Sequence, residues 1–400
     1  MERNAVGRIG WFAAVGLIVL TAAVAASERA SAQAGGGREW FHLNTALAVG
    51  WEVGEIPGDA RSVLLRPAGA AGGERWRHIV SLQARASPAY DLALSELARV
   101  LAQKQILADI RVVNYDDDPS RAQAAIRQVE QGGFDLVLAT GSEAMSWLWA
   151  HYRGGHLPVV SMCAKDPVML GQAMNYSNGT GNNFALTSLN LPADVQMAYA
   201  LELMPRLRNL AIIVDSQNIS AVETQAEPIA AQARARGIRV INVAVQNPNK
   251  AGEELERLVG KAVEAMRLND INLDSSLFLV TGSTSVFDEM ITINAYASRV
   301  PVVSMVPELV REGNGSAVLS VGVSFRSNAH LAAVYVAEIL VHGVRPGDLK
   351  IGVLTPPDIE INFRRAREIG LRIPFEFFES ANVIYDYDDK VVLTNSGFER

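Results

Sequence analysis

Leu157-Pro158-Val159-Val160-Ser161-Met162 decides the fold, because this stretch returns almost unchanged as Val300-Pro301-Val302-Val303-Ser304-Met305. Two further segments return in the same order: residues 110–114 at 238–242, and residues 138–142 at 279–283. The three offsets are 143, 128 and 141 residues, and the extra residues fall in a longer helical pattern over 249–268. Three matches in one order indicate that the chain holds two copies of one structural unit.

Each copy alternates short apolar runs with longer stretches of helical periodicity. In the first copy the apolar runs are 78–83, 110–114, 136–139 and 159–162. Alternation of strand and helix predicts βαβ units with right-handed crossovers on a parallel sheet. We therefore expect an α/β protein with two similar doubly wound parallel-sheet lobes, each with helices on both faces of its sheet.

Length and composition agree with two globular units. The chain has 400 residues, of which 49% are hydrophobic, and domains average about 100–200 residues. There are 36 Lys and Arg against 43 Asp and Glu, a net charge of −7 without a basic run, which argues against a nucleic-acid partner or an anionic membrane surface. The single cysteine, Cys163, excludes an internal disulfide and a thiolate zinc site.

The first 32 residues have the pattern of a signal peptide. Arg3 and Arg8 precede an apolar run over 9–26, and Ala30-Ser31-Ala32 has the small-x-small pattern that signal peptidases cleave. We expect the mature chain to begin near Gln33 and to be periplasmic or secreted. An uncleaved membrane anchor is the alternative, and because no cysteine follows the run we do not expect a lipoprotein anchor.

Residues 33–76 read as an N-terminal extension of unknown role. Closely spaced Gly and Pro residues interrupt any long helix or strand there and leave room for one short hairpin. We expect the first lobe to comprise residues 77–190 and 322–345, and the second lobe to comprise residues 191–321 and 346–400.

Candidate ligand-binding residues follow the strands. Ligands of doubly wound sheets bind beyond the carboxyl ends of the strands, where helix N-termini offer N–H groups. Thr140-Gly141-Ser142 and Thr281-Gly282-Ser283 each follow a strand and open a helix, so their hydroxyl and N–H groups suit a carboxylate. Helix capping by Ser142 and Ser283, with Glu143 as a first-turn acid, is the structural alternative.

Further candidates lie in the neighbouring loops. Lys165 precedes Asp166-Pro167, a pattern typical of a helix start, and its ammonium group suits a ligand anion. In the second copy, Glu308 is either an acceptor for a ligand ammonium or a plain first-turn acid. The loops 84–90 and 215–218 follow the first strand of each copy, and Tyr90 either stacks on a flat ligand or packs on its own sheet.

Signals for catalysis are sparse. The six histidines have no metal-binding spacing, and neither a nucleophile elbow nor a P-loop sequence occurs. We expect no metal, no cofactor and no enzymatic activity. A secreted hydrolase that uses Ser142 or Cys163 as nucleophile is an alternative, and it requires a base within hydrogen-bond reach; for Cys163 a small buried filler is the other interpretation.

Three groups of residues together carry a resemblance to a known family. They are Asp118-Pro119 with Ala122 and Ile126; residues 158–160 leading to Asp166-Pro167-Val168; and Ile361-Asn362, Ala366, Gly370-Leu371, Ile373-Pro374 and Ala381-Asn382-Val383. With these marks the chain resembles the substrate-binding proteins of ABC transporters that have the type I periplasmic-binding fold, and specifically the branch whose characterised members bind aromatic amino acids. The resemblance runs from about Arg77 to Val383.

The resemblance implies two lobes joined by a three-strand hinge, with the helix over 326–341 returning to the first lobe. It implies ligand contacts at Ser87, Tyr90, Thr140, Gly141, Ser142, Glu143, Lys165, Asp166, Asp215, Asn218, Ser283, Thr284, Glu308 and Phe325. One departure concerns Ser324, which stands where relatives often carry an acidic residue before the returning helix. A bound amino acid would then need Glu308 or Asp215 for its ammonium group.

The function that the resemblance implies is capture of a small polar or amino-acid-like solute by hinge closure. The protein would deliver this solute to an ABC permease in the membrane. We expect a monomer without a nucleic-acid partner. A sensory binding protein that signals to a membrane histidine kinase or chemoreceptor is the alternative, and residues 33–76 would then be its partner contact.

Overall fold

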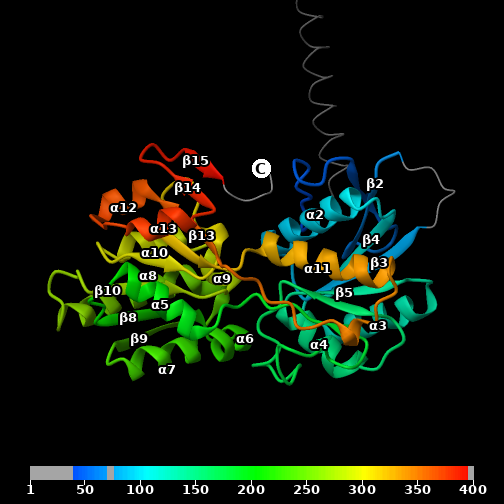
Figure 1. The fold of residues 1–400 in the computed structure, drawn as a ribbon, viewed down its shortest axis with the longest axis horizontal. Helices are drawn as coiled ribbons and strands as arrows, with labels where there is room; N and C mark the ends of the chain where they lie inside the picture. The colour runs from blue at the N-terminus through cyan, green and yellow to red at the C-terminus, as the bar shows by residue number, and fades with distance from the viewer. Residues whose placement is uncertain (1–38, 70–75, 395–400) are drawn as a thin grey trace, which may run out of the picture.

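The computed structural model describes residues 39–69 and 76–394. The chain folds into two α/β lobes that lie side by side along the long axis of the molecule (Figure 1). The expected signal peptide over 1–32 lies outside the described residues. Within the described ranges, no helix combines the length and apolar character that a bilayer span requires.

The described part of the first lobe contains a seven-stranded sheet with the order β1-β2-β4-β3-β5-β6-β7. Strands β3 to β7 pair in parallel, whereas β1 and β2 add two antiparallel strands at one edge. The strands are β1 (Trp51–Glu55), β2 (Ser62–Pro67), β3 (Arg77–Gln83), β4 (Ala108–Asn114), β5 (Leu136–Thr140), β6 (Val159–Met162) and β7 (Phe184–Ala185). The helices are α2 (Pro88–Gln103), α3 (Pro119–Gln131), α4 (Ser142–Tyr152), α11 (Phe325–Leu340) and the 3-10 turn η4 (Pro346–Asp348).

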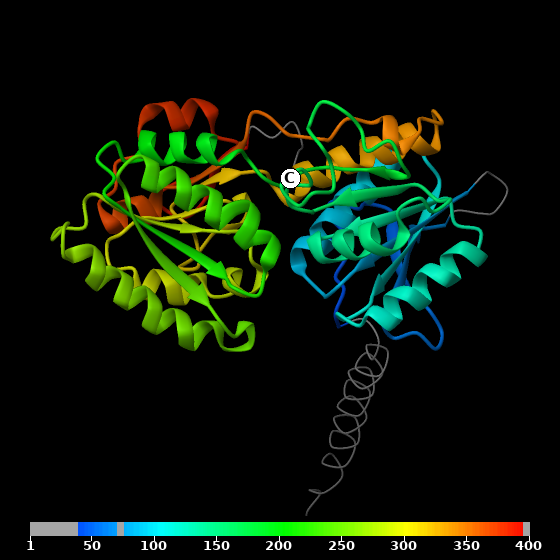
Figure 2. The same cartoon turned by 90° about the horizontal axis from the view of Figure 1, so that it is seen from below.

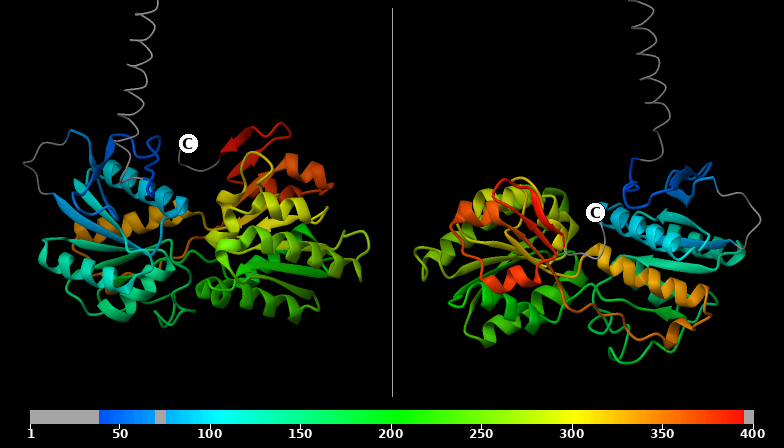
Figure 3. Two further views of the ribbon diagram at one scale, coloured as in Figure 1. Left: turned by 180° about the vertical axis from the view of Figure 1, so that it is seen from behind. Right: turned by 45° about the horizontal axis from the view of Figure 1, so that its top comes forward.

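Helices cover both faces of the first sheet. Successive strand residues point to opposite faces, so Ile79 packs into one apolar cluster, with α2 and α11, while Val80 packs into the other, with α3 and α4. Helices α2 and α11 also pack against each other, as Figure 3 shows for the orange and cyan helices. Because both faces are buried, the central strands consist of nearly continuous apolar runs.

The second lobe contains, over the described residues, an eight-stranded sheet with the order β15-β14-β13-β12-β11-β10-β8-β9. The strands are β8 (Asn209–Asp215), β9 (Arg239–Val245), β10 (Ser276–Val280), β11 (Val302–Ser304), β12 (Leu319–Gly322), β13 (Asp358–Asn362), β14 (Val383–Tyr385) and β15 (Val391–Thr394). The helices are α5 (Ala193–Leu203), α6 (Ile219–Ala221), α7 (Glu227–Ala235), α8 (Ala251–Arg267), α9 (Thr284–Phe287), α10 (Met290–Tyr296), α12 (Phe363–Ile369) and α13 (Phe375–Ser380). Shorter turns are the π-helical η1 (Val222–Ala226) and the 3-10 turns η2 (Pro248–Lys250) and η3 (Pro307–Leu309).

The two sheets repeat one topology. The parallel order β4-β3-β5-β6-β7 of the first lobe corresponds strand by strand to β9-β8-β10-β11-β12 of the second. The three repeated sequence segments fall on the corresponding pairs β4 and β9, β5 and β10, and β6 and β11. The expectation of two similar doubly wound lobes is thus confirmed, with antiparallel strands added at the sheet edges.

Within the described ranges the chain crosses between the lobes three times. The crossings lie between β7 and α5, between β12 and α11, and between η4 and β13. The third crossing, orange in Figure 2, comes later than the expected boundary at residue 345. Residues 346–352 still lie along the first lobe, because Gly181 N donates to Gly347 O at 2.9 Å and Thr187 forms a parallel bridge with Gly352.

The described part of the segment 33–76 belongs to the first lobe. It forms the β1–β2 hairpin, and β2 pairs with β4. Phe41, Trp51 and Leu65 are buried in the same apolar cluster as α2. The segment therefore completes the core of the lobe, which its Gly- and Pro-rich sequence did not reveal.

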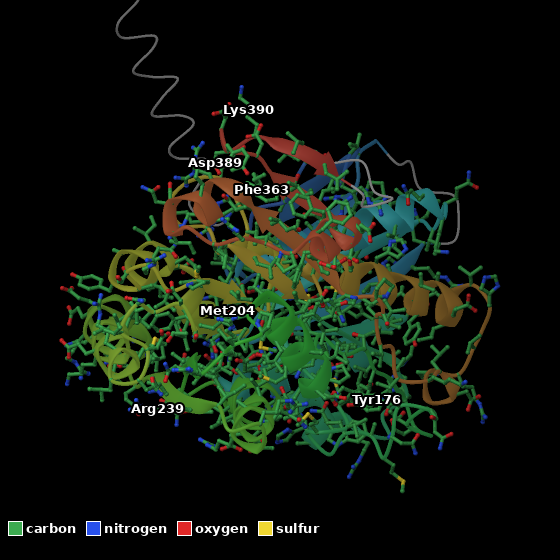
Figure 4. All side chains as sticks on the ribbon, turned by 60° about the vertical axis from the view of Figure 1, so that its left-hand side comes forward. Tyr176, Met204, Arg239, Phe363, Asp389 and Lys390 are labelled. Carbon is green, nitrogen blue, oxygen red and sulfur yellow. The ribbon has the colours of Figure 1, made fainter. Side chains whose placement is uncertain are left out.

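A second hairpin, β14–β15, forms one edge of the sheet in the second lobe. Its turn is fastened by Asp389, which accepts hydrogen bonds from Gly313 N at 2.5 Å and from Asn362 Nδ2 at 3.1 Å. Figure 4 labels Asp389 and Lys390 at this tip, at the other end of the view from Tyr176.

Candidate functional site

A cavity of about 30 Å³ lies between the lobes at the carboxyl ends of their parallel strands. The lining residues are Arg85, Ala89, Tyr90, Ser142, Glu143, Cys163 and Lys165 of the first lobe, Asp215, Asn218, Gly282, Thr284, Ser285 and Phe287 of the second, and Leu189 and Phe325 near the crossings. A space of this size has room for water rather than for a solute of amino-acid size. Such a solute enters only when the lobes separate.

Eight of the fourteen residues predicted from the sequence line this cavity. They are Tyr90, Ser142, Glu143, Lys165, Asp215, Asn218, Thr284 and Phe325. They come from the loops after β3, β5, β6, β8 and β10 and from the start of α11. They lie together because each follows the carboxyl end of a strand or begins α11, and these ends of the two sheets face the same cavity.

Gly141, Thr140, Ser87 and Ser283 lie behind the lining residues. Gly141 has φ +90° and is the N-cap position of α4, so Ser142 is already the first helical residue. Thr140 Oγ1 is 2.8 Å from Ser81 Oγ inside the first lobe, and the Ser87 hydroxyl is buried at the start of α2. Ser283 precedes α9 and its hydroxyl accepts a long hydrogen bond, 3.5 Å, from Asp215 N.

Neither serine hydroxyl makes a capping hydrogen bond: Ser142 is the first helical residue of α4, and Ser283 occupies the N-cap position of α9 without such a bond. Ser142 Oγ instead accepts a hydrogen bond from Lys165 N at 3.0 Å, which ties the loop after β5 to the loop after β6.

Asp166 stabilises its own loop. Its carboxylate accepts hydrogen bonds from Val168 N at 2.9 Å and from the Tyr176 hydroxyl at 2.5 Å. The helix expected at Pro167 is only a turn, which closes with Leu170 N donating to Asp166 O at 3.1 Å. Asp166 therefore positions Lys165 rather than lining the cavity.

Glu308 lies outside this cavity, and the expectation that it faces the ligand is not met. It lines a different interlobe cavity of about 290 Å³, next to Asn44, Leu92 and Asp358. Its Oε1 accepts a hydrogen bond from Phe325 N at 2.7 Å, so the carboxylate serves the N-terminus of α11. Burial raises the pKa of Glu308 to about 7.

Ser324, the departure from the family pattern, caps α11. Its hydroxyl accepts a hydrogen bond from Ser327 N at 2.9 Å, and its own N–H donates to Asp358 Oδ2 at 2.9 Å. It lines the larger cavity and not the one at the strand ends. Of the two acids that the sequence offered for a ligand ammonium, Asp215 alone reaches the smaller cavity.

Acids and bases of the smaller cavity come from both lobes. Arg85 lies 3.6 Å from Glu143 and 3.3 Å from Asp117, and these two carboxylates raise its pKa against the lowering effect of burial. Across the cavity, Asp215 Oδ2 accepts a hydrogen bond from Ser285 Oγ at 2.7 Å, and Asp215 Oδ1 accepts one from Gln217 N at 2.9 Å. These bonds fix the direction of the Asp215 carboxylate.

Lys165 is the other cation. It is 6% exposed, and its Nζ donates to the Gly282 carbonyl oxygen of the second lobe at 2.7 Å. Burial lowers the pKa of its ammonium, and Glu143 partly offsets this effect.

Aromatic side chains form part of the wall. Tyr90 is buried at the start of α2, and burial raises the pKa of its hydroxyl well above the usual value. Phe287 and Phe325 meet edge to face, with ring centroids 6.4 Å apart. Such surfaces suit a flat or apolar part of a solute.

Sequence reasoning did not select Arg85, Ser285 or Phe287. Arg85 lies in the loop 84–90, which is a candidate for ligand contact. Its positive charge among small and polar residues is the sequence feature that could have indicated a ligand-binding role. Phe287 lies four residues after Ser283, and residues at that spacing share one helix face. Helical spacing from the Thr-Gly-Ser loop would have indicated it.

The chemistry that a hydrolase needs does not meet at Ser142 or Cys163. Burial raises the pKa of the Cys163 thiol well above its usual range, with Glu308 adding to the effect. A thiol in that state is a poor nucleophile. Among the residues that the structure describes, no three His, Cys, Asp or Glu side chains form a cluster that could hold a metal ion.

A model of the ABC transporter substrate binding protein family matches residues 86–384, which span both lobes. The chain belongs to this family. Members of the ABC transporter substrate binding family bind solutes and are not enzymes, in agreement with the sequence interpretation.

Solved structures share the fold of this substrate-binding protein. A conserved domain protein from Vibrio cholerae has 18% identity and a TM-score of 0.62, with 77% of this chain and 99% of that chain covered. The ABC domain from Streptococcus pneumonia in complex with L-Trp has 20% identity and a TM-score of 0.63, with 78% and 100% covered. A ligand-free, open substrate binding protein with adhesive properties from Clostridium difficile has 18% identity and a TM-score of 0.57, with 76% and 98% covered. A comparison with curated proteins found no match.

Proposed function

We propose that this substrate-binding protein captures a small polar or amino-acid-like solute between its lobes and delivers it to an ABC permease. One observation carries the proposal: loops at the carboxyl ends of both parallel sheets face one another around a single cavity with charged and aromatic walls. Three crossings hold the lobes together while permitting a hinge motion. Closure would bury the solute, and contacts to both lobes would stabilise the closed state.

An amino-acid-like solute fits the distribution of charge. Asp215 is oriented by Ser285 and would accept hydrogen bonds from an ammonium group. Tyr90, Phe287 and Phe325 offer aromatic surface for a side chain. Aromatic amino acids are the first solutes to test, since the Streptococcus pneumonia relative is described in complex with L-Trp.

The place of action follows from the same proposal. A protein that hands a solute to a membrane permease works outside the cytoplasm. The signal-peptide pattern over 1–32, with a mature chain from about Gln33, supports a periplasmic or secreted location. We propose a monomer that holds one solute between its lobes, at the carboxyl ends of the parallel strands.

Native mass spectrometry of the freshly purified mature protein tests this function. We expect a mass increment that corresponds to one small molecule per chain, lost after partial unfolding and dialysis and restored by adding the solute back. Small-angle scattering should then show a smaller radius of gyration for the solute-saturated protein than for the stripped protein. Superposable scattering profiles for the two samples would contradict capture by hinge closure.

A further inference from the structure

Lys165 is a buried cation with incomplete coordination. An ammonium group can donate three hydrogen bonds. Across the described ranges, Gly282 O is the one acceptor within hydrogen-bond distance of Lys165 Nζ, and no carboxylate lies within ion-pair distance of it. Burying a cation with so few partners costs free energy, so this side chain is poised to gain an anionic partner inside the cavity that it lines.

The single bond that Lys165 makes joins the two lobes. Lys165 follows β6 of the first lobe, and Gly282 follows β10 of the second. The backbone of Gly282 is held from its other side, because Gly282 N donates to Gln225 Oε1 at 2.8 Å. A Cβ on Gly282 would lie 3.2 Å from Gln225 Oε1 and 3.4 Å from Lys165 Cε, so the Gln225 amide is the neighbour that would have to shift.

Further hydrogen bonds connect Gly282 to the first crossing between the lobes. Gln225 Nε2 donates to Asn190 Oδ1 at 3.3 Å, and Asn190 Nδ2 donates to Thr224 Oγ1 at 2.8 Å. Asn190 lies on the first crossing, whereas Thr224 and Gln225 lie on the π-helical turn η1 of the second lobe. A buried polar chain thus runs from the cavity through Gly282 to the segment about which the lobes would rotate.

We propose that Lys165 is an interlobe latch whose ammonium group exchanges the Gly282 carbonyl oxygen for a carboxylate of the captured solute. In the ligand-free protein the Lys165–Gly282 bond favours the closed arrangement but lets the lobes open, and a solute held by both lobes shifts the population further toward closure. The solute carboxylate is a stronger acceptor than a neutral carbonyl, because charge-assisted bonds are about twice as strong. The positive end of the α4 helix dipole, beside Ser142 and Glu143, adds to the attraction for an anion. This inference rests on the proposed capture function and names the chemical class of the solute.

The latch is tested first without any solute. Lys165→Met keeps the length of the side chain and removes its charge, and Lys261→Met removes an exposed charge from α8 as the matched control. We expect scattering from the stripped Lys165→Met protein to show a larger radius of gyration than wild type, while Lys261→Met matches wild type. Circular dichroism checks that each variant is folded. Equal radii for all three proteins would overturn the latch.

The carboxylate is tested with paired probes that differ in one group. The probes are L-phenylalanine and its amide, L-leucine and its amide, and benzoate and benzamide, each measured by the rise in Tm of the mature protein. We expect a rise with at least one acid, none with its amide, and loss of at least tenfold in affinity for that acid in Lys165→Met. A benzoate response without an amino-acid response would assign an organic acid; the reverse would assign an amino acid.

Three results would overturn the carboxylate assignment: amides that bind as well as the acids, full retention of acid binding in Lys165→Met, or no rise with any acid. None of these results touches the capture function. A neutral solute identified by mass spectrometry that compacts the protein would leave capture intact and remove only the role assigned here to Lys165.

Discussion

Gly141 shows how one backbone position shapes the cavity. Its φ of +90° lies in a region that side-chain-bearing residues rarely adopt, and a Cβ there would come within 2.2 Å of the Tyr90 hydroxyl oxygen. The glycine therefore lets the loop after β5 pass close to α2. Tyr90 can line the cavity because Gly141 has no side chain.

Gly141→Ala should destabilise the protein and displace Tyr90. Backbone strain at such a position costs about 1–3 kcal/mol, to which the contact with Tyr90 adds. Urea unfolding measures the change in the free energy of unfolding. Gly260→Ala is the control, because a Cβ there meets open space inside α8, and alanine should stabilise that helix by about 0.5–1 kcal/mol. Equal effects of both substitutions would contradict the role of Gly141.

Asp215→Asn should weaken binding of a solute that carries an ammonium group. The asparagine amide keeps the shape of the side chain but lacks the negative charge of the carboxylate, which the Ser285 hydroxyl orients. A hydrogen bond to a charged group contributes about 1.5–3 kcal/mol, or roughly ten- to hundredfold in Kd. Calorimetric titration with the co-purifying solute measures this change. Asp288→Asn, at an exposed carboxylate beyond α9, should leave Kd unchanged.

The direction of the Glu308 side chain could not be predicted from its position in the sequence. Its place after β11 left two interpretations open: a cavity-facing acid, by analogy with Lys165 after β6, or a plain first-turn acid. Pro307 instead starts the 3-10 turn η3, which directs the carboxylate to the N-terminus of α11. Position along a strand predicts which edge a residue occupies, but the turn that follows decides where its side chain points.

At the scale of elements, the β1–β2 hairpin is part of the first lobe. The sensory alternative treated residues 33–76 as a partner contact that transport does not require. Phe41, Trp51, Val63 and Leu65 are buried under α2 and the sheet, so at least these residues serve the core. Deleting the segment would remove core contacts and would not separate signalling from transport.

Leu65→Ala tests the structural role of the hairpin. Leu65 is fully buried, and removing such a side chain usually costs about 2–5 kcal/mol. Val49→Ala, at a side chain that is 74% exposed just before β1, is the control and should change stability by less than about 0.5 kcal/mol. Thermal unfolding of both variants measures the difference. A small effect of Leu65→Ala would mean that the hairpin packs only loosely.

The contact between the N-terminal segment and α2 should depend on pH. Asp91 Oδ2 accepts a hydrogen bond from His42 N at 3.0 Å, and burial raises the pKa of Asp91 to about 7. Between about pH 4 and pH 7 the folded protein keeps a proton that the unfolded chain has lost, so this group makes the free energy of unfolding fall as pH rises. Above pH 7 its contribution is constant.

Asp91→Asn should remove that part of the pH dependence. We expect the free energy of unfolding of the variant, relative to wild type, to increase from pH 5 to pH 7.5, by at most about 1.4 kcal/mol per pH unit. Denaturant titrations at the two pH values measure it. Asp194→Asn, at an exposed carboxylate of α5, should show no such change; a flat difference for Asp91→Asn would place its pKa at an ordinary value.

Which elements the sequence reveals depends on their periodicity. The parallel strands of both lobes were recognisable because burial on both faces makes them continuous apolar runs that occur twice. Strand β7 has only two residues, and the turns over 167–183 have no period. Residues 346–352 pair with this region, so the sequence did not show that they belong to the first lobe. The third crossing was therefore expected at residue 345, seven residues before Gly352. The sequence left room for one short hairpin within residues 33–76, but it did not show that this hairpin joins the first lobe, because its contacts lie with residues distant in sequence.

At the scale of the whole molecule, Asn190 couples the first crossing to the second lobe. Asn190→Ala should increase the radius of gyration of the ligand-free protein, because it removes the bonds to Thr224 and Gln225 that support Gly282. Small-angle scattering measures this, with Asn178→Ala at an exposed loop position as the control. An unchanged radius would show that Lys165 and Gly282 act without the hinge residues.

The order of elements along the chain also has a consequence during synthesis. Helix α11 covers α2 in the first lobe, yet the second lobe contributes most of the residues that separate the two helices. At about 5–20 residues per second, a ribosome needs roughly 10–45 s to bridge that interval. Over this time the part of α2 that α11 covers stays exposed, whereas β8 to β12 emerge as one uninterrupted run. The lobe that is translated first is therefore completed only after most of the second lobe has been synthesised.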